Sequence, residues 1–331
     1  MTLGARGRRI GAAIVLMVVL TGCTSSPDGS AAPPESSTVD SSSGGVRPGI
    51  AVPRSRAATV HAVEEDIGET FDVVRVFRRW EDRIPDQELA ALIESGHRIH
   101  LSVRPMRADG TAISWAELAS TEVGEPLHEE LVEWLSAVAA MPEGTYFTVS
   151  HEPETKEGAV NGTASDFKQM WRRVHKLLGS MDAEHVALTW TMTGGAFSDD
   201  RAELWYPGDD VVDVIGTDSY NWFTCQGGER PWYELEQLLF QPLAFARSHA
   251  KPLVIPEFAS AEDPADPQRR ARWMQNAAEF LSRPEVAADI EFAAWFNVTA
   301  PGGTYPNCVW DYDTTPESAQ AFAELMGTLG R

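Results

Sequence analysis

The feature that most constrains the fold is an alternation of short β-branched segments with longer segments of helical period, from residue 49 onward. Side chains of a strand alternate between two faces, whereas apolar residues of a helix recur every three or four positions. Strands are predicted at Ile50–Val52, Val73–Phe77, Arg98–Ser102, Tyr146–Ser150, His185–Trp190, Val211–Thr217, Pro252–Ile255 and Ile290–Phe296. Helices are predicted at Thr59–Glu65, Pro85–Ser95, Leu127–Ala140, Phe167–Leu178, Leu235–Ser248, Ala271–Leu281 and Phe322–Met326.

Strands that alternate with helices in this number are typical of a (β/α)8 barrel, the TIM barrel. The alternative is a two-domain periplasmic-type binding protein, which is also built from βα units. That fold needs a hinge near its middle, and the sequence has no linker there. No internal repeat with a period of about 20 to 50 residues is visible either. The sequence therefore predicts an α/β protein with a single (β/α)8 barrel over residues 49–331.

Residues 1–22 predict a secretory signal. Three arginines precede an apolar stretch at positions 10–20, which is shorter than the roughly 20 residues that a transmembrane helix needs. The stretch ends in Leu20-Thr21-Gly22-Cys23, which resembles the bacterial lipoprotein cleavage box. That resemblance implies cleavage before Cys23 and attachment of a diacylglycerol to its sulfur. A twin-arginine export signal at Arg8-Arg9 is the alternative, although its flanking residues fit poorly.

Residues 23–48 predict a tether. Of the 25 residues from Thr24 to Pro48, 15 are Ser, Pro or Gly, and no apolar period is present. We therefore expect an exported protein that is lipid-anchored in the cell membrane and faces outside. Export places Cys225 and Cys308 in an oxidising compartment. The sequence leaves two alternatives for them, a disulfide or two free buried thiols.

Composition narrows the partners. The chain has 49 acidic and 27 basic residues, a net charge of −22, which repels phosphate backbones and argues against nucleic acid. This negative charge is compatible with a neutral substrate. The 11 Trp residues offer flat apolar faces for sugar rings or bases, with core packing as the alternative use. His151-Glu152 precedes Pro153, which ends any helix there and argues against a zinc-peptidase motif. We expect a monomer without metal or cofactor.

Two carboxylates follow predicted strands. Glu152 comes after the strand at Tyr146–Ser150, and Glu257 after the strand at Pro252–Ile255. Their separation corresponds to three βα units, so their strand ends face each other across the mouth of a barrel, where active sites of this fold lie. Most glycoside hydrolases use two facing carboxyl groups for catalysis.

The surrounding residues resemble glycoside hydrolase family 26 of clan A, a family best known for β-mannanases. His151 stands directly before Glu152, where most of the clan has Asn. The run WYPGDDVVDVIGTDSYN at Trp205–Asn221 follows a long signature of that family. Glu257-Phe258 and Trp295 complete the resemblance, which spans roughly residues 146–300.

The resemblance implies roles for individual residues. Glu152 matches the general acid/base and Glu257 the nucleophile of a retaining reaction through a covalent glycosyl-enzyme intermediate. Tyr220 matches a tyrosine that donates a hydrogen bond to the nucleophile, and His151 a histidine of the subsite where the bond breaks. Trp295 matches the aromatic platform beneath that sugar.

Further substrate-binding candidates follow other strands. Asp218 matches a family position near the site, with a turn cap as the alternative. Arg75 either reaches substrate hydroxyls or forms a buried ion pair, and Trp190 either lines the cleft or packs in the core. Candidates for outer sugar subsites are Trp222, Phe223, Trp310, Tyr312 and Trp80.

The expected function is a retaining, endo-acting hydrolase of a β-linked polysaccharide, with β-1,4-mannan as the first choice. Family mannanases usually place aromatic residues soon after the His-Glu pair, whereas here Pro153–Gly158 is followed by no aromatic residue before Phe167. A β-glucanase or β-xylanase of the same family therefore stays open. The alternative from another class is a non-catalytic carbohydrate-binding lipoprotein.

Overall fold

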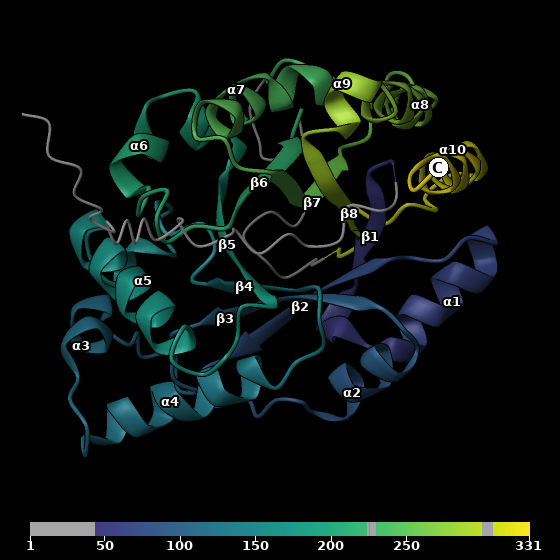
Figure 1. The fold of residues 1–331 in the computed structure, drawn as a ribbon. Coiled ribbons are helices and arrows are strands. Elements are labelled where there is room, and N and C mark those ends of the chain that lie inside the picture. Colours follow the sequence, from purple (N-terminus) through teal and green to yellow (C-terminus); the bar gives the residue numbers. More distant parts are fainter. Residues whose placement is uncertain (1–43, 224, 226–229, 300–306) are drawn as a thin grey trace, which may run out of the picture. The chain divides into compact units, whose positions relative to one another are not determined.

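A computed structural model of the chain describes residues 44–223, 225, 230–299 and 307–331. Parallel strands form a closed barrel in which each strand pairs with the next and β8 pairs with β1 (Figure 1). The strands are β1 (Arg47–Ala51), β2 (Val73–Arg79), β3 (Arg98–Arg104), β4 (Thr145–Val149), β5 (Val186–Thr193), β6 (Val214–Asn221), β7 (Leu253–Ser260) and β8 (Ile290–Phe296). The predicted (β/α)8 barrel is confirmed.

Helices surround the barrel (Figure 1). They are α1 (Ala57–Ile67), α2 (Gln87–Glu94), α3 (Trp115–Ser120), α4 (Pro126–Ala139), α5 (Ala164–Leu178), α6 (Arg201–Trp205), α7 (Leu235–Ser248), α8 (Arg269–Leu281), α9 (Pro284–Ala287) and α10 (Pro316–Thr328). Short 3-10 helices are η1 (Pro53–Ser55), η2 (Ala159–Asn161) and η3 (Gly194–Phe197). The short α3, α6 and α9 were not predicted, because fewer than two turns leave little periodicity to detect.

Local sequence explains where the long helices begin. The Asp86 side chain accepts a hydrogen bond from the Leu89 amide at the start of α2. Thr163 and Asp166 form a reciprocal capping box at the start of α5. These side chains satisfy amide groups that a helix leaves without partners in its first turn.

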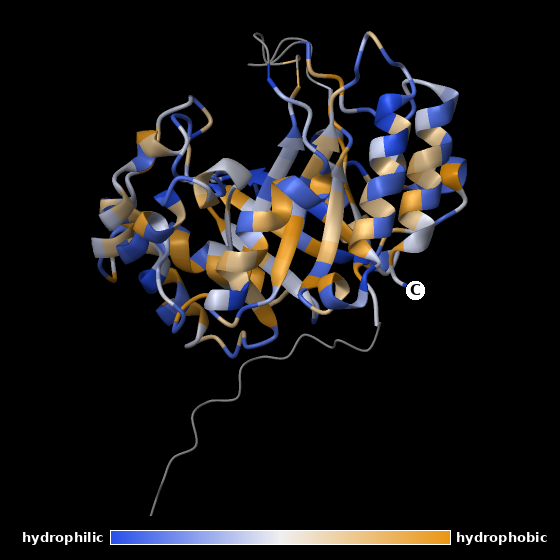
Figure 2. Ribbon diagram, turned by 90° about the horizontal axis from the view of Figure 1, so that it is seen from above, coloured by the Kyte–Doolittle hydropathy of each residue, from blue (hydrophilic) through white to orange (hydrophobic). Residues whose placement is uncertain are grey.

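Apolar side chains form two layers. Inward-facing residues fill the barrel, namely Val73, Tyr146, Ala187, Val214, Val254, Phe292 and Ala294. The larger layer lies between strands and helices, and hydrophobic residues concentrate on the central strands in Figure 2. Near the amino-terminal ends of the strands, Tyr146 donates a hydrogen bond to Glu291 and accepts one from Arg47.

All the strands except β8 differ from the predicted bounds by a few residues, and three of these differences matter for the argument. β1 begins at Arg47, so the barrel includes the last two residues assigned to the tether. β6 runs to Asn221, which places the end of the signature inside the strand. β7 runs to Ser260, so Glu257 is a strand residue and its orientation is fixed by pairing with β6 and β8.

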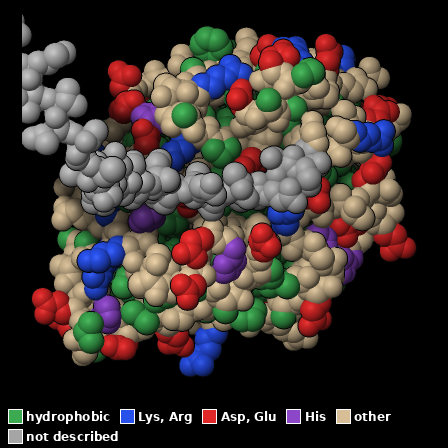
Figure 3. Space-filling model, viewed as in Figure 1, with side chains coloured by type: hydrophobic (Ala, Val, Ile, Leu, Met, Phe, Trp, Pro, Cys, Tyr) green, Lys and Arg blue, Asp and Glu red, His purple; other side chains and the backbone are tan. Residues whose placement is uncertain are grey.

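The predicted signal peptide, Cys23 and most of the predicted tether lie outside the described residues. Within the described ranges, no helix combines the length and the apolar character that crossing a membrane requires. Acidic side chains are spread over the face drawn in Figure 3, with Lys and Arg among them, in keeping with the net charge of −22.

Candidate active site

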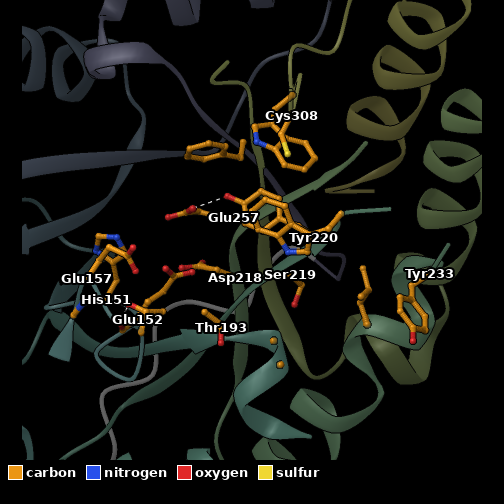
Figure 4. A pocket seen from close by; sticks show the side chains of 18 of the residues that line it. His151, Glu152, Glu157, Thr193, Asp218, Ser219, Tyr220, Tyr233, Glu257 and Cys308 are labelled. Atoms are coloured by element: carbon orange, nitrogen blue, oxygen red, sulfur yellow. Dashed lines mark hydrogen bonds between the residues drawn. The ribbon is translucent and has the colours of Figure 1, made fainter. Parts of the chain in front are cut away.

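A cavity of about 820 Å³ opens at the carboxyl ends of the strands. Residues from the ends of β3 to β8 and from the segments after them line it, including Glu152, Asp218 and Glu257 (Figure 4). The carboxyl end of the strands is the face on which enzymes of this fold carry their active sites. The structure therefore brings both predicted catalytic carboxylates into one cavity.

Glu152 lies on a tight turn directly after β4. Its φ is 48° and that of Ser150 is 58°, a left-handed conformation that is uncommon for residues other than glycine. The Glu152 amide donates to the Thr191 carbonyl of β5 at 2.9 Å, and the Thr155 hydroxyl donates to the Glu152 carbonyl at 2.8 Å. A Cβ atom at Gly158 would lie 2.4 Å from the same carbonyl oxygen, so only glycine fits there. The turn thus fixes the backbone of Glu152, while its side chain lines the cavity.

The surroundings of Glu152 favour its protonated form. Burial, followed by the negative charges of Glu257 and Glu154, raises the pKa of Glu152 to about 8. Glu154 itself is held by Thr193, whose amide and hydroxyl donate to Oε1 at 2.9 and 2.6 Å. At neutral pH, Glu152 carries a proton that it can transfer to an acceptor in the cavity.

Glu257 receives two hydrogen bonds. The Tyr220 hydroxyl donates to Oε2 at 2.6 Å (Figure 4), and the Arg75 guanidinium donates to Oε1 at 3.5 Å. Glu257 is 6% exposed. A buried carboxylate with a phenol donor and an ion-pair partner is suited to act as an anion, because its charge is compensated on two sides.

Arg75 lies inside the barrel rather than at its surface. It is fully buried, donates to His100 Nε2 at 3.0 Å, and its guanidinium lies 4.7 Å from the ring centroid of Phe77. It does not line the cavity. Of the two predicted roles, the structure supports the buried ion pair with Glu257, and the expectation of a direct substrate contact is wrong.

Asp218 is a third carboxylate of the cavity. It is 3% exposed, and neither carboxylate oxygen has a hydrogen-bond partner among the described residues. Burial, followed by the charges of Glu257 and Glu152, raises the pKa of Asp218 well above its ordinary range. Figure 4 shows its side chain beside that of Glu152, directed into the cavity. It is placed to contact a bound hydroxyl group rather than to cap a turn.

His151 lines the cavity beside Glu152. Its Nδ1 lies 2.9 Å from the Ser102 hydroxyl, and its ring meets Phe77 edge-on at 5.5 Å. Burial and the charge of Arg75 lower the pKa of His151 to about 3. It is therefore a neutral imidazole at physiological pH, able to accept or donate one hydrogen bond.

One wall of the cavity is aromatic. Tyr220 lies 5.0 Å from Trp222, 5.1 Å from Trp310 and 5.7 Å from Phe296, measured between ring centroids. All four line the cavity, as does Phe223. These five residues, called the aromatic wall below, offer the flat apolar faces that pyranose rings pack against.

The disulfide left open by the sequence is present. Cys225, after β6, is bonded to Cys308, after β8, with their Cα atoms 4.8 Å apart. Cys308 itself lines the cavity. The bridge joins the two segments that carry Trp222 and Trp310.

The expectation that Trp295 forms the sugar platform is wrong. Phe292 and Ala294 of β8 face the barrel interior, so alternation along the strand turns Trp295 outward. Trp295 is fully buried between β8 and the helices, and its Nε1 donates to the Trp310 carbonyl at 2.9 Å. The next residue, Phe296, lines the cavity instead.

Trp190 also packs in the core rather than in the cleft. It is fully buried and packs against Tyr206, Phe197 and Phe245. Two other aromatic candidates lie away from the cavity: Tyr312 donates a hydrogen bond to Asp66, and Trp80 packs against Trp134.

Sequence analysis missed several residues of the cavity. Gly194 in η3 is one, and a Cβ atom there would lie 2.7 Å from the Ser219 hydroxyl, so its absence lets η3 approach β6. Others are Arg104, Glu157, Arg230, Tyr233 and Gln237. The pair Gly194-Gly195 soon after a predicted strand was a usable signal, whereas nothing in the sequence marks the other residues as part of a cavity.

Residues 145–261 match the family model of glycosyl hydrolase family 26. This match spans β4 to β7 and contains both Glu152 and Glu257. It confirms the resemblance to family 26 drawn from the sequence.

A curated relative is Endoglucanase H of Acetivibrio thermocellus, 32% identical over 124 residues, or 37% of this chain. The aligned part is 12% of that protein, so this chain spans only a small part of it.

Solved structures share the barrel. The catalytic domain of a family 26 endo-β-1,4-mannanase from a Bacillus species superposes with a TM-score of 0.61 at 18% identity, covering 86% of each chain. A modular endo-β-1,4-mannanase from Cellulomonas fimi gives 0.59 at 19% identity, covering 84% of this chain and 70% of that one. A family 26 β-mannanase from Bacteroides ovatus gives 0.58 at 18% identity, covering 85% and 88%. At this identity the likeness establishes the fold.

Proposed function

We propose that the chain is a retaining glycoside hydrolase that cleaves a β-linked polysaccharide internally, with β-1,4-mannan as its substrate. The observation that carries the proposal is the pair of carboxylates in one cavity, of which Glu152 is held protonated and Glu257 is held by two donors. The family 26 match over the same residues supports it.

In the first step, Glu257 attacks the anomeric carbon while Glu152 transfers its proton to the departing glycosidic oxygen. The C1–O bond breaks, a C1–Oε bond forms, and the leaving chain departs as an alcohol. Formation of the ester removes the negative charge of Glu257. Because that charge helps to raise the pKa of Glu152, the pKa falls in the intermediate. In the second step Glu152 takes a proton from water, the water oxygen bonds to C1, and the C1–Oε bond breaks to release Glu257 as a carboxylate.

The shape of the site supports internal cleavage. The cavity is lined on both sides of the carboxylates, by Arg104 and Glu157 on the β3–β4 side and by Tyr233 and Gln237 after β6. The aromatic wall continues past Tyr220 to Trp222 and Phe223. Sugars on either side of the broken bond therefore have residues to contact.

Cleavage of β-glucan is a second candidate. The curated relative at 32% identity is an endoglucanase, and the turn from Pro153 to Gly158 supplies no aromatic side chain to the cavity. Release of reducing ends from soluble mannan, mixed-linkage β-glucan and β-1,3-xylan would distinguish the substrates. Inactivity on all of them, with binding retained, would leave a carbohydrate-binding protein.

The decisive experiment replaces Glu257 by Gln. We expect loss of turnover in a variant that still folds, because the amide preserves the shape of the side chain but is not a nucleophile. Full activity of the E257Q variant would refute the assignment. Proton NMR of the first-formed product should show the β anomer, whereas early α anomer would indicate an inverting reaction.

We also propose that the mature chain is exported and held at the cell membrane by a lipid on Cys23. The apolar stretch at positions 10–20 followed by Leu20-Thr21-Gly22-Cys23 supports this proposal.

A further inference from the structure

A second cluster of functional side chains lies at the opposite end of the barrel from the cavity. His61 and Glu64 stand one turn apart on α1, and His97 directly precedes β3. The cluster is thus at the amino-terminal end of the strands, whereas the cavity is at their carboxyl ends. None of these residues has a part in the proposed hydrolysis.

The three side chains converge. One ligand atom from each lies within 4.8 Å of those from the other two. The rings of His61 and His97 stack with their centroids 5.9 Å apart. The side chains of His97 and Glu64 are 5% and 13% exposed, while His61 is exposed and leaves the cluster open to solvent.

His97 faces an oxygen acceptor at each ring nitrogen. Its Nδ1 lies 3.1 Å from the Leu92 carbonyl and its Nε2 lies 3.0 Å from Glu64 Oε1. An imidazolium donates to both acceptors, whereas a neutral imidazole has a single N–H and can turn its other nitrogen to a cation held between His97 and Glu64. A histidine that donates from one nitrogen to a backbone carbonyl and turns the other to a shared site is the usual arrangement around a bound metal.

The carboxylate is also held in place. Glu64 Oε1 accepts a hydrogen bond from the Phe71 amide at 2.9 Å, which fixes the side chain toward His97. Ser95 lies beside the open side, with its hydroxyl 3.1 Å from His61 Nε2. Two imidazoles and one carboxylate are a ligand set that Zn²⁺ accepts, with water in the fourth position.

We propose that His61, Glu64 and His97 bind a divalent transition metal, for which Zn²⁺ is the probe. The ion joins α1 to the start of β3, two segments that meet at the base of the barrel. The site is structural and independent of the proposed hydrolysis, because it shares no residue with the cavity.

The test measures Zn²⁺ binding to the full chain, without a histidine tag, by calorimetry and by equilibrium dialysis with metal analysis. We expect one Zn²⁺ per chain and a higher melting temperature when Zn²⁺ is present. His61→Ala should weaken binding at least about tenfold and remove the thermal shift. This variant is safe for folding because His61 is exposed.

His249→Ala is the matched control. His249 also lies between two carboxylates, 2.8 Å from Asp209 and 3.6 Å from Glu203, but has no second histidine in a comparable cluster among the described residues. It should leave Zn²⁺ binding unchanged. Equal binding by the wild type and the H61A variant, loss of binding in the H249A variant alone, or no binding by the wild type would each overturn the proposal. The last result would leave Glu64 and His97 as an ion pair only.

Discussion

Glu152 and Glu257 differ in the side chains that surround them. Glu152 is buried beside other acids, which favours the neutral form, and Glu257 is contacted by a guanidinium and a phenol, which compensate the anion. Two residues of similar chemistry are thereby separated into an acid and a nucleophile, as the two-carboxylate mechanism requires.

The pH dependence of the reaction should follow from Glu152. Its protonated form is the one that donates to the leaving group, and that form is lost as pH rises through about 8. We expect kcat/KM on a soluble polymer to fall on the alkaline side near that pH. The Glu152→Gln variant should lose this alkaline limb together with roughly 10²- to 10⁴-fold of the rate. An unchanged alkaline limb in the variant would assign it to another group.

Tyr220→Phe removes the 2.6 Å hydrogen bond to Glu257 without changing the shape of the ring. A hydrogen bond to a charged group is worth about 1.5–3 kcal/mol, which corresponds to roughly a 10- to 100-fold loss of kcat. The matched control is Tyr206→Phe, because Tyr206 donates to Asp209 at 2.8 Å away from the cavity. Steady-state kinetics of both variants check this prediction, and equal rates would contradict it.

Which residues belong to the cavity was easier to predict from the sequence than the direction in which a strand turns each side chain. Tyr220 was predicted because it lies in a long family signature, and Glu152 and Glu257 because each follows a predicted strand. Trp295 was assigned to the cavity and Phe296 was not, although the two are adjacent. A shift of one residue on a strand moves a side chain to the other face, and no pattern in β8 marks which of two aromatic residues faces inward.

At the scale of elements, all the strands were found but the segments after them were not. Strands are detected because buried β-branched runs are distinctive, which is why the barrel was predicted from the sequence. The cavity lining after β4, β5, β6 and β8 comes largely from loops and short helices, whose position depends on contacts far along the chain. The pairing of Cys225 with Cys308 is an example, since 83 positions separate them.

The disulfide should matter for both stability and substrate binding. Replacing both cysteines by serine removes a cross-link that closes a long loop, which typically lowers the free energy of unfolding by about 2–4 kcal/mol. The segments carrying Trp222 and Trp310, whose rings lie 5.3 Å apart, would then be less fixed. We expect KM for polymer to rise more than kcat falls. Thermal unfolding and kinetics measure the two effects, and an unchanged KM would show that the aromatic wall holds without the bridge.

At the scale of the whole molecule, the proposed membrane anchor can be tested separately from the proposed catalytic activity. Cys23→Ser removes the proposed site of lipid attachment. We expect the variant to leave the membrane fraction while its activity per molecule stays the same, because Cys23 precedes the barrel by more than 20 residues. Fractionation with an activity assay measures both, and a variant that stays with the membrane would refute the anchor.

The described chain enters the barrel at the end opposite the cavity. β1 starts at Arg47, and the last residue, Arg331, packs against Gly45, so the first and last described residues meet beneath the floor of the barrel. The described chain therefore begins and ends on the side of the barrel away from Glu152 and Glu257, and neither described end of the chain lies at the mouth of the cavity.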